Sequence, residues 1–206
     1  MFAYDINNFD FDSHIDDLID MAKSIEADKI TILTGPNGYG KSFLRKLVGM
    51  RNSKYDFPKV ASFSMEMRTT KRDEWSALSS IHMDDPTDAT SNHTCQMMQN
   101  LMRNTPNRYF IIDEPEIGMG KEIILGYINA LNQEIRTLKE KDGFRGLMII
   151  THSEFFIDNF QHDHFINLEG LTFQQWKERE IKAISPEKLS EWSLAMWRAI
   201  QKRLKD

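Results

Sequence analysis

A glycine-rich segment near the N-terminus, Gly35–Ser42 (GPNGYGKS), limits what this chain can fold into more than any other feature. It follows a β-branched run, Lys29–Thr34, whose pattern predicts a short buried strand. The residues after it, from about Lys41 to Met50, suit a helix. Its glycines let the backbone wrap closely around an anion with N–H groups pointing inward, and the helix adds its positive dipole end. The combination predicts a phosphate-binding loop between a strand and a helix.

The segment fits the G-x-x-x-x-G-K-[ST] pattern of a P-loop without a gap. In this pattern the Lys41 ammonium would bind the β- and γ-phosphates of ATP, and the Ser42 hydroxyl would be a ligand of Mg²⁺. The alternative is a glycine-rich turn with no ligand, but the flanking strand and helix favour the P-loop. We expect the nucleotide to be bound by Gly35, Pro36, Asn37, Gly38, Tyr39, Gly40, Lys41, Ser42 and Phe43.

A second apolar run, Arg108–Asp113 (RYFIID), predicts a strand buried on both faces; it ends on one acid, Asp113, and a second acid, Glu114, follows it. A carboxylate in such a place is costly unless something compensates its charge. Beside a P-loop, Mg²⁺ and its waters would do so, which assigns Asp113 to the metal. Glu114 would orient or deprotonate the attacking water. The alternative is an ordinary strand end with two solvated acids.

A histidine follows the third apolar run, Gly146–Thr151 (GLMIIT). His152 could donate a hydrogen bond to a γ-phosphate oxygen and so distinguish ATP from ADP. A histidine after a strand is more often structural when it stands alone. Its position after the two other elements favours a catalytic role beside Glu114.

Strand and helix patterns alternate along the chain, which predicts an α/β fold with a mostly parallel sheet flanked by helices. With 206 residues, the chain has room for one compact domain of this class. We expect an ATP-binding domain over residues 1–170, with a reduced helical subdomain at about 66–107, and a helical C-terminal extension over 171–206. Further strands are expected at Lys59–Ser64 and His164–Leu168. Further helices are expected from a cap at Asp12 or Ser13, near Asp73–Ile81 and Ser91–Arg103, over Lys121–Lys141, and in a tail broken before Pro186.

The order of GPNGYGKS, IIDEPE and IITHS resembles Walker A, Walker B with its catalytic glutamate, and the switch histidine of ABC-class ATPases. Within that class, Asp113–Met119 (DEPEIGM) resembles the form common in soluble RecF, SMC and overcoming-lysogenisation-defect (OLD) type groups. The resemblance spans about Lys29 to Leu168. It implies a P-loop NTPase fold of ABC type, with ATP and Mg²⁺ as cofactors and hydrolysis by Glu114 and His152.

The resemblance also implies that two copies close head-to-tail on ATP, as a homodimer or higher oligomer. The class would place its signature loop near Ala89–Thr94, but no Gly-Gly or Ser-Gly pair occurs there, so Thr90 or Ser91 would supply a hydroxyl instead. The glutamine expected after the second strand is missing, and Glu66 could replace it. These departures leave a second interpretation open, an ATP-dependent scaffold with little hydrolysis.

The segments between and after the motifs bear on partners. Residues 66–90 are too few for a long coiled coil, and the residues after Gly170 are too few for a nuclease domain. We therefore expect a separate effector or adaptor chain, in nucleic-acid maintenance or defence against mobile DNA. The weaker alternatives are the ATPase of a membrane transporter and a small-molecule kinase.

Composition indicates a cytoplasmic protein without a membrane partner. The single cysteine, Cys95, suits a reducing compartment, and no apolar run approaches the length of a membrane span. The net charge is −5, but residues 1–28 are strongly acidic and residues 171–206 are basic. Solvated helix faces explain this best, while a basic docking surface for an acidic partner or for nucleic acid is the alternative.

Three smaller features have two interpretations each. Phe9 or Phe11 could stack on adenine, and the segment Gln161–His164 could bind a metal, although a structural role is more common for each. Apolar residues at helical spacing in the tail favour core packing over a partner interface. They are Trp176, Leu189, Trp192, Leu194, Trp197 and Ile200.

Overall fold

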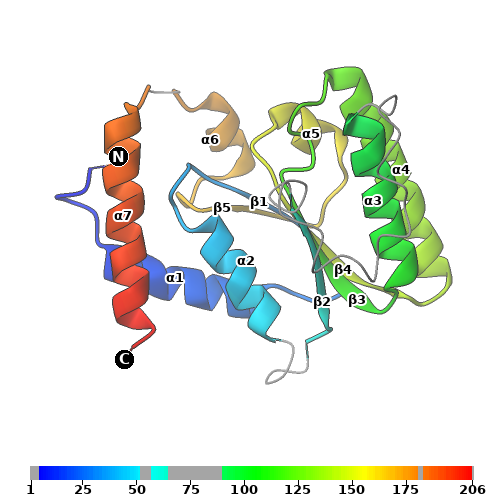
Figure 1. Ribbon diagram of the computed structural model, residues 1–206, viewed down its shortest axis with the longest axis horizontal. Coiled ribbons are helices and arrows are strands. Elements are labelled where there is room, and N and C mark those ends of the chain that lie inside the picture. Colours follow the sequence, from blue (N-terminus) through cyan, green and yellow to red (C-terminus); the bar gives the residue numbers. More distant parts are fainter. Residues whose placement is uncertain (1–4, 52–56, 65–89, 181–182, 206) are drawn as a thin grey trace. The chain divides into compact units, whose positions relative to one another are not determined.

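The computed structural model describes residues 5–51, 57–64, 90–180 and 183–205 (Figure 1). Strands and helices alternate along most of this part of the chain. The strands are β1 (Ile30–Thr34), β2 (Val60–Ser64), β3 (Arg108–Asp113), β4 (Phe144–Ile150) and β5 (His164–Asn167). The helices are α1 (Phe11–Ser24), α2 (Lys41–Met50), α3 (Thr90–Asn104), α4 (Lys121–Glu140), α5 (Glu154–Asn159), α6 (Phe173–Glu178) and α7 (Pro186–Arg203).

The five strands form one sheet in the order β2-β3-β4-β1-β5. β2 runs parallel to β3, and β3 runs parallel to β4, so that Asp113 lies opposite Ser64 on one side and Ile150 on the other. Parallel neighbours need crossover connections, and helices supply these in an α/β fold. The expected α/β class, with a parallel sheet flanked by helices, is confirmed.

The chain divides into two compact units. Unit 1 comprises residues 1–26, 33–57 and 165–206, and unit 2 comprises residues 27–32 and 58–164. The division passes through β1 and β5. Residues 171–206, which the sequence suggests as a terminal extension, belong to the same unit as α1, α2 and the glycine-rich loop between β1 and α2.

In unit 1, helices α1 and α7 pack together through apolar residues at helical spacing. Helix α1 buries Ile15, Leu18 and Ala22. Helix α7 buries Trp192, Met196 and Ile200, whereas Leu194 and Trp197 of the same helix are exposed. The expectation of core packing in the tail therefore holds for Trp176, Trp192 and Ile200 but not for Leu194 and Trp197, while Leu189 is half-buried.

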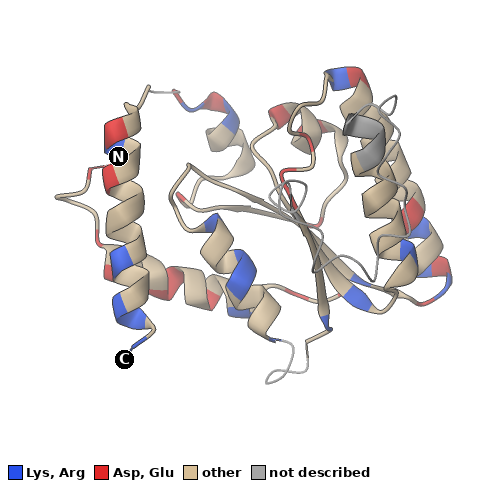
Figure 2. Ribbon diagram, viewed as in Figure 1, with Lys and Arg blue, Asp and Glu red and all other residues tan. Residues whose placement is uncertain are grey.

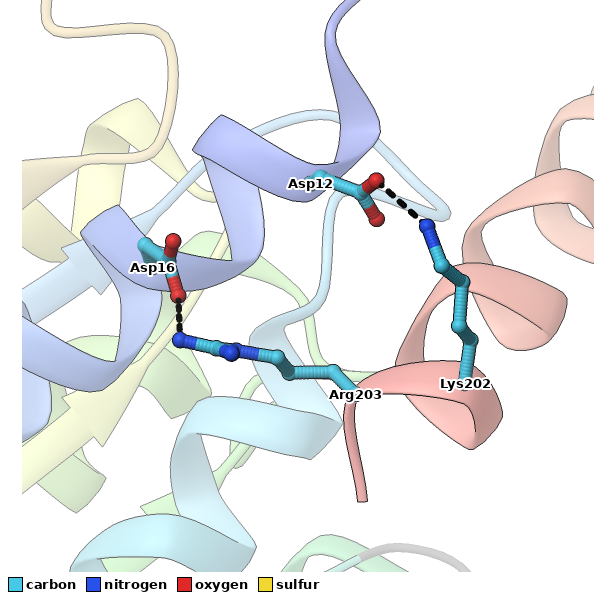
Figure 3. Close-up of a pocket in the computed structure, with 4 residues that line it drawn as sticks. All are labelled: Asp12, Asp16, Lys202 and Arg203. Atoms are coloured by element: carbon cyan, nitrogen blue, oxygen red, sulfur yellow. Dashed lines mark hydrogen bonds and ion pairs between the residues drawn. The ribbon is translucent and has the colours of Figure 1, made fainter. Parts of the chain in front are cut away.

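Charged side chains also join α1 to the end of α7 (Figure 3). Lys202 Nζ lies 2.8 Å from Asp12 Oδ2, and Arg203 Nη2 lies 2.7 Å from Asp16 Oδ1. Figure 2 shows acidic residues along α1 and basic residues at the end of α7. Part of the uneven charge of the sequence is thus paired within unit 1.

In unit 2, the core lies around β3 and β4, whose central residues are fully buried. Helix α4 covers β4 and contacts α3 and α5, and it buries Ile124, Tyr127, Ile128 and Leu131. Arg103 of α3 donates hydrogen bonds to both carboxylate oxygens of Glu134, which is buried in α4.

Most observed elements lie within two residues of their expected bounds. The N-cap of α1 is a correction: Asp10, not Asp12 or Ser13, accepts the hydrogen bond from Ser13 N at 3.0 Å. The cap residue needs an extended backbone, which Asp10 has, while Asp12 and Ser13 already lie inside the first turn. The short helix α5 was not expected. The expected helix at Asp73–Ile81, and with it residues 66–89 of the helical subdomain, lies outside the described residues.

Pro186 begins α7 and Ser185 caps it, which agrees with the helix break expected before the proline. Among the described helices, none combines the length and the apolar composition that a membrane span needs.

Candidate functional site

The loop between β1 and α2, in unit 1, contains the glycines that the P-loop pattern singles out. Gly38 and Gly40 have φ values of 78° and 94°, a region that side-chain-bearing residues rarely adopt. The loop leaves the buried strand β1 at Thr34 and enters α2 at Lys41. Glycine is therefore needed at both positions for the chain to turn from strand to helix over so few residues.

The N-terminus of α2 has no side-chain cap. Its N-cap residue is Gly40, and its first turn contains no acidic residue. Side chains of Asp10, Ser153, Thr172 and Ser185 cap α1, α5, α6 and α7, while α4, which follows Gly120, shares the lack of a side-chain cap. The first N–H groups of a helix need an acceptor, so an uncapped N-terminus after a glycine-rich loop suits a bound anion.

Lys41 folds back over the loop. Its Nζ donates hydrogen bonds to the carbonyl oxygens of Gly35 and Pro36, at 2.9 and 3.0 Å. The side chain is half-buried, while Asn37 and Ser42 are exposed and Phe43 is half-buried. The ammonium is thus held within the loop, where a phosphate could replace the two carbonyl groups as its partner.

The opposite side of the loop is held by aromatic residues from both ends of the chain. The Tyr39 ring is buried and stacks on Trp192 of α7, with ring centroids 4.9 Å apart. Trp192 Nε1 donates a hydrogen bond to Gly38 O at 3.3 Å, and His14 Nε2 lies 3.0 Å from Tyr39 O. The carbonyl oxygens of Gly38 and Tyr39 therefore both have side-chain partners. Because the Tyr39 ring is buried against Trp192, only the backbone of Tyr39 could contact a nucleotide.

Phe9 and Phe11 belong to the same aromatic cluster. Their ring centroids lie 4.6 and 5.0 Å from that of Trp192, and the two phenylalanine rings contact each other edge-on. The cluster gives both rings a packing role in unit 1. Stacking of either ring on adenine stays a prediction.

The second set of candidate residues lies in unit 2, at the end of β3. Asp113 is the last residue of the strand and is half-buried. Glu114 follows with φ 50°, a left-handed conformation that costs a residue other than glycine roughly 1–2 kcal/mol. Its N–H donates to Ile150 O of β4 at 2.8 Å. Strain of this kind is concentrated at functional sites, where the surrounding structure maintains it.

His152, after β4, reaches the same carboxylate. Its Nε2 lies 3.4 Å from Glu114 Oε1, and both side chains remain about one-third exposed. The two predicted catalytic residues are thus brought together, although they come from different strand ends. The carboxylate can accept a proton from water, and the imidazole beside it can donate a hydrogen bond to an anionic substrate.

Glu116 lies beside this pair and was given no role by the sequence. Its Oε1 accepts hydrogen bonds from the Thr151 hydroxyl and from His152 N, the latter at 3.2 Å. Burial raises the pKa of its carboxyl group above the usual value, and the charge of Glu114 adds to the shift, while the hydrogen bonds oppose it. The sequence does show Glu116 as the last residue of DEPE, but it does not show that this side chain is partly buried against Thr151.

The donors expected for Mg²⁺ are oxygen atoms, which suit this hard cation. Ser42 is exposed at the start of α2, and Asp113 is the last residue of β3. Their role as metal ligands stays a prediction. No group of three or more potential ligands from His, Cys, Asp and Glu occurs in the described part of the chain.

Two residues of the segment Gln161–His164, named as a possible metal site, make hydrogen bonds to the backbone. Asp163 Oδ2 accepts a hydrogen bond from Ile30 N at 2.8 Å, and His162 Nδ1 lies 2.9 Å from Phe160 O. These contacts hold the turn before β5. Thr90 and Ser91, which could replace the missing signature residues, are the first two residues of α3. Glu66, which could replace the missing glutamine, lies outside the described residues.

Comparison with known proteins gives a distant similarity. No family model matches the chain, and no curated protein matches it. One solved structure that matches is titled "RNase-L Inhibitor", with 18% sequence identity and a TM-score of 0.42. The match covers 66% of this chain and 31% of that chain, so this chain spans less than a third of the protein that it resembles.

Proposed function

We propose that this protein binds ATP with Mg²⁺ at Gly35–Ser42 and hydrolyses it. The observation that carries the proposal is the loop between β1 and α2. Two glycines with positive φ lead into an uncapped helix, and Lys41 is held over the loop by two carbonyl groups. Backbone N–H groups, a helix dipole and an ammonium group together suit the phosphates of a nucleotide.

Hydrolysis is assigned to Glu114 and His152. Glu114 acts as the general base for the attacking water, and His152 donates a hydrogen bond to the γ-phosphate. The 3.4 Å approach of His152 Nε2 to Glu114 Oε1 supports this division of roles. The strained backbone of Glu114 supports it further, because a solvated surface acid has no need of such a conformation.

Mg²⁺ would be held by the Ser42 hydroxyl and the Asp113 carboxylate. When bound, the ion neutralises phosphate charge during the transfer. That the motifs act on one nucleotide is proposed from their order along the chain.

The ABC type is the finer part of the proposal. It rests on the order of the three motifs and on DEPE at Asp113–Glu116. In that class ATP drives head-to-tail association of two copies and hydrolysis resets it. We place the protein as the cytoplasmic ATPase component of a system with a separate effector chain, acting in nucleic-acid maintenance or anti-phage defence.

The first test concerns binding. Replacing Lys41 by Ala removes charged hydrogen bonds to phosphate, so the affinity for Mg-ATP should fall about 10-fold to 100-fold. Lys46→Ala is the matched control, because Lys46 is an exposed lysine in the same helix. Equilibrium binding of a fluorescent ATP analogue measures both. Equal affinities for the two variants would remove the P-loop from its assigned role.

The second test concerns turnover. Glu114→Gln keeps the size of the side chain but removes the base, so kcat should fall about 10²-fold to 10⁴-fold while ATP binding is retained. Phosphate release under saturating Mg-ATP measures kcat. Hydrolysis at the parent rate would show that Glu114 is not the base.

A second candidate function is an ATP-dependent scaffold with little turnover. The absence of glycine pairs from Ala89–Thr94 favours it, since the class uses that loop to complete the site of a partner copy. Assembly size measured with ATP and with ADP separates the two functions. A scaffold would assemble with ATP and release almost no phosphate.

A further inference from the structure

Glu116 is a half-buried acid of the candidate hydrolysis site. It comes two residues after Glu114 in the segment that follows β3, yet its hydrogen-bond donors lie in the segment that follows β4. Oε1 accepts from both Thr151 and His152, and Oε2 is buried without a hydrogen-bond partner. A surface acid serving only solubility would not be placed in this way.

The direction of these hydrogen bonds follows from the donors. Ser153 N donates to the Thr151 hydroxyl oxygen at 3.0 Å, so the Thr151 hydroxyl hydrogen is directed to Glu116. Thr151 is fully buried, which prevents water from replacing the carboxylate. Ser153 also caps α5 by accepting a hydrogen bond from Phe156 N. Glu116 is therefore linked to the start of α5 by a continuous chain of hydrogen bonds.

The same carboxylate fixes the backbone of His152, whose imidazole lies 3.4 Å from Glu114. Glu114 is fixed independently, because its N–H donates to Ile150 O of β4. Loss of Glu116 would leave Glu114 in place but release the loop that bears His152. Burial raises the pKa of the Glu116 carboxyl group, which agrees with a group selected for position rather than for charge.

We propose that Glu116 is a positioning residue for ATP hydrolysis, which holds His152 at its working distance from Glu114 by accepting the hydrogen bonds of Thr151 and His152 N. The inference rests on the proposed function of the site. Glu116 itself touches no reacting atom in this scheme. Small displacements of a catalytic group lower rates steeply, so its removal should be felt in the chemical step and not in ATP binding.

The test compares Glu116→Ala with Glu116→Gln in the full chain. Glutamine keeps an acceptor oxygen at the same reach, whereas alanine removes it. We expect Glu116→Ala to lower kcat about tenfold or more and to leave the KM for ATP within about twofold. Glu116→Gln should retain kcat within about threefold of the parent. Glu140→Ala is the matched control, because Glu140 is an exposed glutamate at the end of α4.

Two further measurements separate positioning from a folding defect. All rates are expressed per chain that binds ATP, so that unfolded material is not counted. Thr151→Val, which keeps the shape of the side chain but removes the hydroxyl donor, should lower kcat in the same direction as Glu116→Ala. In a His152→Ala background, Glu116→Ala should have no additional effect, because the residue acts through the histidine.

The outcomes distinguish the two proposals. A parent protein that does not hydrolyse ATP overturns the proposed function, and with it the role of Glu116. A parent that hydrolyses ATP while Glu116→Ala keeps the parent kcat overturns only the role of Glu116. Equal losses from Glu116→Ala with and without His152 would also overturn it.

Discussion

Gly38 and Gly170 share nearly the same backbone conformation, with φ values of 78° and 73°, but differ in their surroundings. A Cβ at Gly38 would lie 2.8 Å from Trp192 Cδ1, whereas a Cβ at Gly170 would meet nothing within 4 Å. Alanine costs about 1 kcal/mol of backbone strain at each site. At Gly38 it must also displace the indole, which adds about 1–3 kcal/mol.

We therefore expect Gly38→Ala to lower the free energy of unfolding by at least twice as much as Gly170→Ala. Only Gly38→Ala should also weaken binding of Mg-ATP. Urea unfolding and nucleotide titration of both variants provide the check. Equal destabilisation would mean that the contact between Trp192 and the loop contributes little.

At the scale of residues, sequence patterns predict candidate roles but not contacts. The roles of Lys41 and Asp113 are predictions from their motifs, because the chemistry of phosphate and Mg²⁺ restricts the residue types at these positions. The pairing of Glu114 with His152 follows from the parallel order of the strands. The contact of Trp192 with Gly38 does not, since no local pattern links positions so far apart in the chain. The burial of Glu116 also depends on such a contact, with Thr151.

An ion pair between Arg103 of α3 and Glu134 of α4 joins the two helices, and only the glutamate is buried. The Glu134 side chain is 3% exposed, while that of Arg103 is 56% exposed. Arg103→Ala would leave a buried carboxylate without its cation, and we expect a loss of about 2 kcal/mol, less than for a fully buried pair. Urea unfolding gives the change in free energy.

The matched control replaces both partners, Arg103→Met with Glu134→Leu. Apolar side chains of similar size remove the buried charge, so the double variant should recover most of the loss. A double variant as unstable as Arg103→Ala would show that the ion pair itself, and not the stranded carboxylate, determines the cost.

Helix α7 offers a comparison within one element. Trp192 is fully buried against Tyr39 and the two phenylalanines, and Trp197 is 53% exposed. Trp192→Ala should destabilise the protein by about 3–5 kcal/mol, whereas Trp197→Ala should change its stability by no more than about 0.5 kcal/mol. Thermal unfolding distinguishes these values. Similar losses would indicate that Trp197 is covered in solution by another chain.

Elements bounded by glycine or by a change from apolar to acidic residues are predicted best. Helix α2 and strand β3 have the expected bounds, because Gly40 precedes the helix and Asp113 ends the strand. Helix α5 escaped prediction because its six residues are too few for a helical pattern to show. The N-cap of α1 was misplaced by two residues or more, since Asp10, Asp12 and Ser13 are all good caps and only the backbone conformation separates them.

Over the whole molecule, composition indicates one α/β domain, but it does not tell which distant segments share a core. The sequence suggests a boundary near residue 170, because the motifs end there. The structure groups residues 165–206 with the first helix and with the loop before α2. The contacts responsible are apolar and long-range, such as the approach of both Leu18 and Met196 to Gly40. Alternating helix and strand patterns carry no information about them.

The distribution of charge gives the last prediction. Lys202 and Arg203 pair with Asp12 and Asp16 across nearly the whole chain, but all four side chains are about half exposed or more. Water and salt screen such pairs, so Lys202→Ala with Arg203→Ala should cost less than about 1 kcal/mol at low ionic strength. In about 1 M NaCl, where the Debye length is roughly 3 Å, the difference from the parent should vanish.

Trp192→Ala is the control for this measurement, because loss of apolar packing persists in high salt. If the double variant lost several kcal/mol at every salt concentration, the ion pairs rather than the aromatic cluster would hold α7 to α1. If it kept its stability but lost affinity for an anionic polymer such as heparin, the two cations would also serve a basic docking surface. If the double variant is less stable than the parent only at low salt, the aromatic contacts of Trp192 hold α7 beside the glycine-rich loop. The ion pairs then add only a small, salt-dependent contribution to stability.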